Sequence, residues 1–300
     1  MQRQPIMVNH FRGLFMYFKN VQKNNLTYSI DMLRLRTNLS VGDFSKLEYR
    51  FKTVWHDKVA KQWSSSGIAD FKYNYNIEVA FGQSFWFGFL HNSEKPNQNE
   101  KSEYNFTLEF NPNKLKDNRL IKYILNLSRE WVLKQFDIAV DIPISVLDIC
   151  GLDKKRYKDV RTFNAGYDNK TIYVGRTNNR FKIYNKKIES KLDIAGELTR
   201  VEVTSKQNYK FSALGYFKPD LNIPDLYTNN YYYTFKDYED KTLLAILYAV
   251  QAGFNINDLT RVYKDKVTKL LKGGNHIDID VNCIYEILNL TLKYYLVGEI

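Results

Sequence analysis

Four short segments between Phe136 and Thr204 alternate apolar and polar residues, and this alternation constrains the fold more than any other feature of the chain. They read FDIAVDI at 136–142, TIYVG at 171–175, RFKIYN at 180–185 and LTRVEVT at 198–204. Side chains along a strand point alternately to its two faces, so each segment predicts a strand with one apolar and one polar face. We expect the strands to lie together, with helices covering the shared apolar face.

The rest of the chain predicts an α+β protein: an antiparallel sheet with helices on one face, plus a mainly helical C-terminal part. Apolar residues at helical spacing appear at Leu115–Trp131 and again after Glu239, ending in a helix at Val281–Leu296. A change of character after Ser205 predicts an α+β domain at 1–205 and a helical region at 206–300. The strands expected in the first third are Leu26–Arg36, Glu48–Trp55, Phe71–Ala80, Ser84–Leu90 and Tyr104–Phe110.

The chain is rich in basic residues and poor in cysteine and histidine. Its 300 residues carry a formal net charge of +11, which favours an anionic partner, most simply nucleic acid. A/T-rich codons are a second explanation, because Lys, Asn, Tyr and Ile are all abundant. Two cysteines and four scattered histidines predict neither a disulfide framework nor a local zinc motif. Without a membrane-length apolar run or an export signal, we expect a cytoplasmic protein without membrane contact.

One surface of the predicted sheet collects acidic, basic and phenolic side chains. Carboxylate oxygens are ligands for Mg²⁺ or Mn²⁺, and arginine and lysine bind phosphate. A phenol becomes a nucleophile when a metal or cationic neighbours favour its phenolate. Charged residues that only form cross-strand ion pairs would give the same alternation, and this alternative stays open. The residues on this surface are Asp137, Asp141, Tyr173, Arg180, Lys182, Tyr184, Arg200 and Glu202.

These motifs resemble those of the replication initiation factors of rolling-circle plasmids and the related nicking relaxases of conjugative elements. The family pattern is an Arg-x-Asp-φ-φ-φ-Asp strand, then Tyr-φ-Gly, then Arg-φ-Tyr-Asn/Asp-Lys, then Arg-φ-Glu. The chain carries, in this order, FDIAVD, Tyr173-Val174-Gly175, Lys182-Ile183-Tyr184-Asn185-Lys186 and Arg200-Val201-Glu202. Gln135 stands where the family has its first arginine. Lys182 replaces the arginine of the tyrosine motif and loses its bidentate phosphate fork.

The resemblance implies a site-specific single-strand endonuclease and strand transferase. Tyr184 would attack a phosphodiester at a replication origin, become linked to the 5′ phosphate and release a 3′ hydroxyl that primes replication. Tyr173 is a rival nucleophile, but lysines flank Tyr184 and the family's tyrosine lies in this motif.

The same resemblance assigns roles to the surrounding residues. A Mg²⁺ or Mn²⁺ ion would stabilise the charge of the transition state. Arg200 would orient Glu202 or reach phosphate, and these two roles stay open. The implied metal ligands are Asp137, Asp141 and Glu202, the catalytic phosphate-binding residues are Lys182, Arg180 and Lys186, and the DNA-binding residues are Arg200, Tyr173 and Lys187.

The implied partners are origin DNA, single-stranded at the nick, a host helicase and a second copy of the chain. We expect a homodimer because an initiator must cut twice and the chain has one clear tyrosine motif. The alternative function is a replication protein that binds the origin without cutting it. For Tyr227–Tyr238 we weigh base stacking against an irregular packed connection. For Asn257–Lys272 and the helical C-terminal region we weigh origin recognition against a solvated basic face or dimerisation.

Overall fold

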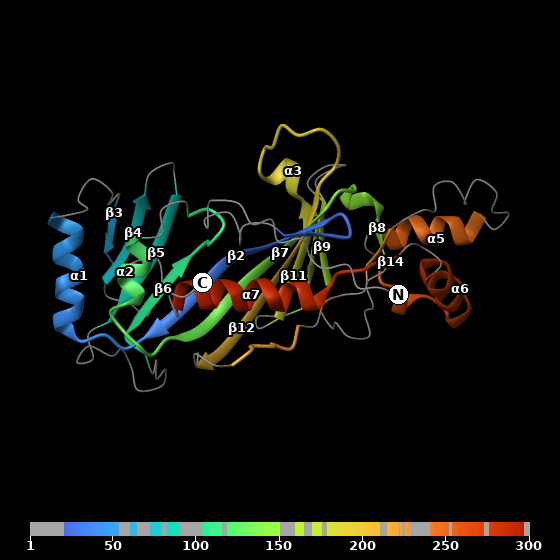
Figure 1. Ribbon diagram of the computed structural model, residues 1–300. Helices are drawn as coiled ribbons and strands as arrows, with labels where there is room; N and C mark the ends of the chain where they lie inside the picture. Colours follow the sequence, from blue (N-terminus) through green and yellow to red (C-terminus); the bar gives the residue numbers. More distant parts are fainter. Residues whose placement is uncertain are drawn as a thin grey trace, which may run out of the picture.

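A computed structural model describes residues 21–53, 61–64, 73–79, 83–90, 104–115, 119–150, 160–164, 170–175, 179–210, 215–221, 223, 226–228, 241–251, 254–272 and 276–296. The dominant feature is one long antiparallel sheet that lies behind helix α7 (Val281–Leu296) in Figure 1. The predicted fold class, α+β with a large antiparallel sheet and a helical C-terminal part, is confirmed.

The long sheet has eleven strands within the described residues. Their order is β3-β4-β5-β6-β2-β7-β12-β11-β10-β9, with β1 paired to β2. The four strands that carry the polar motifs, β7, β12, β11 and β10, are direct neighbours in this order. The strands are β1 (Val21–Lys23), β2 (Leu26–Thr37), β3 (Lys61–Ser64), β4 (Tyr73–Val79), β5 (Gln83–Phe89), β6 (Phe106–Phe110), β7 (Val132–Ile142), β9 (Val160–Asn164), β10 (Lys170–Val174), β11 (Asn179–Asn185) and β12 (Thr199–Lys210).

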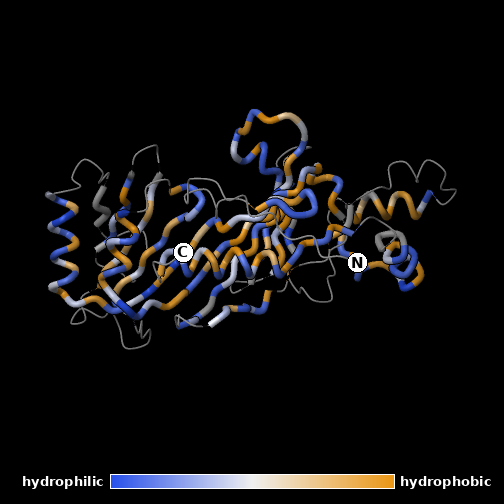
Figure 2. The backbone as a smooth tube through the Cα atoms, viewed as in Figure 1, coloured by the Kyte–Doolittle hydropathy of each residue, from blue (hydrophilic) through white to orange (hydrophobic). Residues whose placement is uncertain are grey.

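The core lies on one face of this sheet. Ile30, Ile138 and Val203 come from neighbouring strands, and each is at most 2% exposed. They belong to the same apolar cluster as Ile284 and Ile287 of α7. Apolar and polar residues alternate along the strands that α7 crosses (Figure 2). Burial of the apolar set therefore leaves the polar set on the opposite face.

Three helices cover this apolar face. Phe44 of α1 (Val41–Thr53) stacks on Phe89 of β5 with ring centroids 3.9 Å apart. Tyr295 of α7 meets the edge of Phe110 at 4.8 Å. Phe89 and Phe110 lie on the same face, because β5 and β6 pair Phe89 with Phe106 and Phe85 with Phe110. α2 (Arg119–Leu125) contacts α7 and contributes buried residues to the same core.

Two predicted elements of the first half differ from the structure, one in type and one in length. Residues 48–53 of the strand expected at Glu48–Trp55 form the C-terminal part of α1, whose buried Phe44, Leu47 and Phe51 follow the helical period, and residues 54 and 55 lie outside the described residues. The Ser40 hydroxyl accepts a hydrogen bond from the Asp43 backbone N–H at 3.0 Å, as an N-cap does. The helix expected over Leu115–Trp131 is shorter, because the Trp131 indole N–H donates to the Leu125 carbonyl just where α2 ends.

The C-terminal part contains two separate arrangements. Residue 205, the predicted domain boundary, lies inside β12, and α7 belongs to the core of the main sheet. α5 (Lys241–Gln251) and α6 (Arg261–Lys272) instead share a small core of Leu243, Leu247 and Val267. Of the segment Tyr227–Tyr238, only residues up to 228 are described. The remaining elements are the second sheet, β8 (Ile149–Cys150), β13 (Leu226–Thr228) and β14 (His276–Ile277), the 3-10 helices η3 (Val146–Asp148) and η5 (Ile256–Asp258), and α3 (Lys186–Glu189).

No helix in the described part of the chain combines the length and apolarity needed to cross a bilayer.

Candidate active site

Antiparallel pairing arranges the predicted site residues in rows across the polar face of the sheet. Residues directly opposite each other in paired strands share a face. The predicted polar surface therefore exists, and it lies on the side of the sheet away from α7. The three rows are Thr171–Tyr184–Arg200–Asp141, Tyr173–Lys182–Glu202–Ala139 and Arg180–Thr204–Asp137.

Tyr184 contacts a carboxylate of this surface. Its hydroxyl donates a hydrogen bond to Oε2 of Glu202 at 3.1 Å. The side chain is 4% exposed, and burial, followed by the nearby negative charge of Glu202, raises the pKa of Tyr184 far above its ordinary value. The phenol is therefore neutral at physiological pH, with its proton directed to a group that can accept it.

Two lysines flank the Tyr184 ring. Nζ of Lys182 lies 3.9 Å from the ring centroid, and Nζ of Lys186 lies 5.8 Å from it. Both are within the range of cation–π attraction. Lys186 also forms an ion pair with Glu189 at 2.7 Å. Lysine side chains are long and flexible, so Lys182 and Lys186 can turn from the phenol ring toward a bound phosphate.

The rival tyrosine, Tyr173, has different neighbours. Its ring meets the edge of Phe163 at 5.6 Å and lies 5.8 Å from the Arg180 guanidinium. Phe163 is 56% exposed, and Arg180 is exposed as well. Phe163, which the sequence analysis did not select, stands opposite Thr171 on β9. Tyr173 and Phe163 together form an aromatic pair near the edge of the polar face, one strand away from Tyr184.

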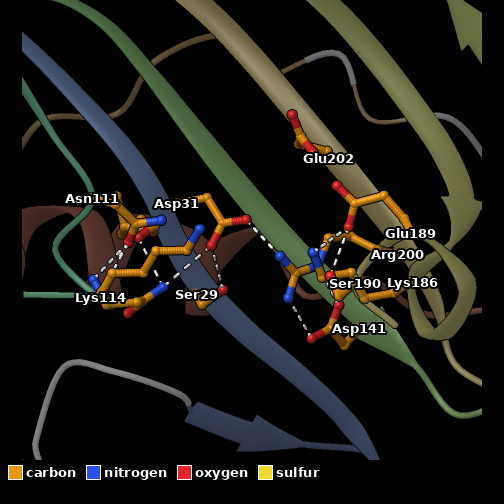
Figure 3. A network of polar contacts seen from close by, with 12 residues as sticks. Ser29, Asp31, Asn111, Lys114, Asp141, Lys186, Glu189, Ser190, Arg200 and Glu202 are labelled. Carbon is orange, nitrogen blue, oxygen red and sulfur yellow. Dashed lines mark hydrogen bonds and ion pairs between the residues drawn. The ribbon is translucent and has the colours of Figure 1, made fainter. Parts of the chain in front are cut away.

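Arg200 is held by two aspartates. Its Nε and Nη2 donate to the two oxygens of Asp141 at 2.6 and 2.7 Å, and its Nη1 donates to Asp31 at 2.6 Å (Figure 3). Burial disfavours its charge, but the hydrogen bonds to Asp141 and the charge of Asp31 outweigh burial and raise the pKa of Arg200. Arg200 therefore forms a cross-strand ion pair, which is the alternative that the sequence left open. Its hydrogen bonds go to Asp141 and Asp31 and not to Glu202.

Asp31 was not predicted as a site residue, although the alternation in β2 contains a signal for it. The buried residues of β2 change from even positions, Tyr28 and Ile30, to odd positions, Leu33 and Leu35. Such a change of parity indicates a β-bulge, and the register of β2 with β7 shifts between Ile30 and Met32. The bulge brings Asp31 to Arg200, a contact that strict alternation does not predict.

Asp137 lies further along β7, in the third row. Burial raises its pKa to about 6, and the negative charge of Glu202 adds to this. Hydrogen bonds from Thr204 and Gln135 act in the opposite direction. Gln135 therefore contacts the first acid of the motif, where the family pattern has an arginine. A neutral amide does not hold that carboxylate in its charged form as an arginine would.

The short helix α3 begins at Lys186, two residues after Tyr184. Asn185 caps it by accepting a hydrogen bond from the Ile188 backbone N–H at 3.1 Å. This cap fixes the start of the loop that follows α3 and projects from the sheet (Figure 1). Lys187 turns toward that loop and donates to the Gly196 carbonyl at 3.0 Å, while Lys186 points back to the tyrosine ring.

The three predicted metal ligands match a hard divalent cation in their chemistry but not in their arrangement. Both oxygens of Asp141 accept hydrogen bonds from Arg200, and Glu202 accepts one from Tyr184. Within the described residues, no group of three or more His, Cys, Asp or Glu side chains is arranged to hold a metal ion. The set as it stands does not fit the ion, and metal binding stays a prediction.

Comparisons with known proteins give one structural neighbour to report. No protein-family model matches the chain, and no curated protein matches its sequence. Among solved structures, the chain is similar to a rolling circle replication initiator protein from Geobacillus stearothermophilus, with 12% identity and a TM-score of 0.37. The match covers 60% of this chain and 74% of that chain. A likeness at this level does not assign a family, so function has to be argued from the site.

Proposed function

We propose that the protein is a rolling-circle replication initiator that nicks one DNA strand and transfers it through a phosphotyrosine at Tyr184. The observation that carries the proposal is the hydrogen bond from the Tyr184 hydroxyl to Glu202, beside Lys182 and Lys186. A nucleophile, a proton acceptor and phosphate-binding cations are the groups that this reaction needs. They lie in the tyrosine and glutamate motifs that resemble the initiator family.

In the proposed reaction the Tyr184 hydroxyl attacks a phosphodiester and gives its proton to Glu202. Burial raises the pKa of the phenol, so the proton leaves as the phenol oxygen attacks and not before. A bond forms between the tyrosine oxygen and phosphorus, and the bond from phosphorus to the 3′ oxygen breaks. The leaving oxygen takes a proton from water and becomes the free 3′ hydroxyl, while Glu202 gives its proton back to water. Reversal of these steps by a second 3′ hydroxyl joins the strand again.

Cations of the polar face would bind the reacting phosphate. Lys182 and Lys186 are nearest to the tyrosine ring, and Arg180 is exposed two residues before Lys182 on β11. Negative charge grows on the phosphoryl oxygens in the transition state, so fixed positive charge favours it over the ground state. Tyr173 would contact a base of the bound strand, and Lys187 would contact the strand from the loop after β11.

In this proposal Arg200 is a positioning residue. It is held by Asp141 and Asp31, and it stands directly opposite Tyr184 in the register. The ion group fixes β12 against β7 and β2, and thereby fixes Glu202 two residues further along β12. The DNA contact expected for Arg200 would require it to release one of these aspartates.

Origin DNA, a second copy of the chain and a host helicase remain partners by resemblance. Mg²⁺ or Mn²⁺ remains the implied cofactor, and when bound it would stabilise charge on the phosphoryl and leaving oxygens. The steps above use only residues of this chain, because the acids of the face are engaged with Arg200 and Tyr184.

A second candidate is a replication protein that binds the origin without cutting it. The low exposure of Tyr184, 4%, favours this function, since a nucleophile must reach its phosphate. Tyr184 can attack only if bound DNA displaces Lys182 and Lys186 from the ring and so opens access to the hydroxyl. The two candidates differ in whether a covalent adduct forms.

Adduct formation is therefore the decisive experiment. The protein is incubated with a labelled pool of single-stranded oligonucleotides of random sequence, and adducts that survive detergent are selected. We expect an adduct whose tryptic peptide contains Tyr184, its loss in Tyr184→Phe and its retention in Tyr173→Phe. Adduct formation by Tyr184→Phe would refute the assignment of the nucleophile, and DNA binding without any adduct would support the second candidate.

A further inference from the structure

A cluster of basic residues lies on the polar face, on the three strands that carry Arg200 and its two aspartates, β12, β7 and β2. Gln135 of β7 is paired with Arg34 on one side and Lys206 on the other. Val132, three residues earlier, is paired with Arg36 on one side and Lys210 on the other. Lys134 stands between these two rows. We call these five residues the basic cluster: Arg34, Arg36, Lys134, Lys206 and Lys210.

The register puts the basic cluster on the same face as the site. Gln135 directs its amide to Asp137, at 3.4 Å, and accepts a hydrogen bond from Arg34 at 3.2 Å. The core residues Leu133 and Phe136 point the other way and are fully buried. Irregularities in both strand pairs at this point let Lys134 and Gln135 share the polar face.

The members of the basic cluster repel one another. Burial, followed by the charges of Arg36, Lys206 and Arg34, lowers the pKa of Lys134. Nζ of Lys134 donates to the neutral Asn208 side chain at 2.8 Å, while Arg34 forms an ion pair with Glu109. Lys206 and Lys210 are exposed. Crowded like charges cost free energy in the free protein, and a polyanion laid across them would remove this cost.

We infer that the basic cluster is a second DNA-binding site, which holds the sugar–phosphate backbone of duplex DNA flanking the strand bound at Tyr184. The inference rests on the proposed function for the nature of the polyanion. Asp141, in the row of Tyr184, is six residues from Gln135 along β7, which is about 20 Å at ~3.3 Å per residue. Since the backbone of B-DNA advances ~3.4 Å per base step, the cluster would contact phosphates about six base steps from the cut.

Salt dependence of duplex binding tests this inference. The full chain is titrated against a labelled duplex over a range of NaCl concentrations, and the slope of log affinity against log salt is compared between variants. The double variant Lys206→Gln/Lys210→Gln removes two exposed charges of the basic cluster. The matched control, Lys46→Gln/Lys52→Gln, removes two exposed charges from α1, which covers the opposite face.

We expect the cluster variant to lower the magnitude of the slope by about two, because each lost phosphate contact contributes about 0.9. The control pair should leave the slope at the wild-type value. Equal slopes in both double variants would overturn the inference. The test does not depend on cleavage: if the protein formed no adduct, the proposed function would fail while the slope still reported on the cluster.

Discussion

Glu202 lies directly opposite Lys182 across the β11–β12 pair, yet its Oε2 accepts its hydrogen bond from Tyr184, one row away, at 3.1 Å. The carboxylate thus serves the phenol, while the ammonium of Lys182 lies over the phenol ring. Because the pKa of Tyr184 is raised, the phenol depends on this acceptor to lose its proton.

Glu202→Gln should slow adduct formation by about 10²- to 10⁴-fold, the usual contribution of a general base. The amide oxygen can still accept the tyrosine hydrogen bond, so the fold and DNA affinity should be unchanged. The measurement is the rate of adduct formation across pH, with DNA binding measured in parallel. A wild-type rate in the variant would mean that Glu202 only orients the ring.

Arg200→Lys should destabilise the protein by about 2 kcal/mol, because one ammonium cannot replace the hydrogen bonds to Asp141 and Asp31. Arg34→Lys is the matched control. Arg34 pairs with Glu109 where the side chains are 27% and 30% exposed, against 13% for Arg200, so its replacement should cost less than about 1 kcal/mol. Urea unfolding of both variants measures the difference, and equal losses would contradict a special role for the Arg200 group.

Asp137→Asn should become progressively more stabilising, relative to the wild type, as pH rises. The pKa of Asp137 is about 6 in the folded protein against an ordinary 3.8, so the folded state holds the proton more tightly. Stability from this group is present below pH ~3.8 and is lost as pH rises to and through about 6. Between pH 5 and pH 7.5 the difference in unfolding free energy should change by about 1 kcal/mol in favour of the variant. A difference that does not vary with pH would show that Asp137 titrates normally.

Chelation should stop adduct formation and leave DNA binding intact, if the cofactor implied by the resemblance is used. The experiment adds excess EDTA and then restores Mg²⁺ or Mn²⁺. Recovery by either ion would show that the acids rearrange from the contacts described, since Asp141 is now held by Arg200. Full activity in EDTA would show that arginine and lysine alone stabilise the transition state.

Much of the fold and of the site followed from the sequence. The period of two placed Tyr184, Lys182, Glu202 and Arg200 on one face, because consecutive side chains of a strand must point in opposite directions. The same rule correctly placed Ile138 and Val203 in the core. Where a short segment lacked a clear period, as at Glu48–Trp55, a helix was mistaken for a strand.

Pairing between distant strands decided what alternation could not. The sequence by itself determined which residues share the polar face in the regular parts of the strands, since that depends only on neighbours along each strand. Only the tertiary structure decided that Arg200 binds Asp141 and Asp31, that Tyr184 reaches Glu202 and that Arg34, Arg36 and Lys206 gather around Lys134. Those contacts depend on register and on bulges in β2 and β7, which are fixed by the packing of the whole sheet against its helices and not by any one segment.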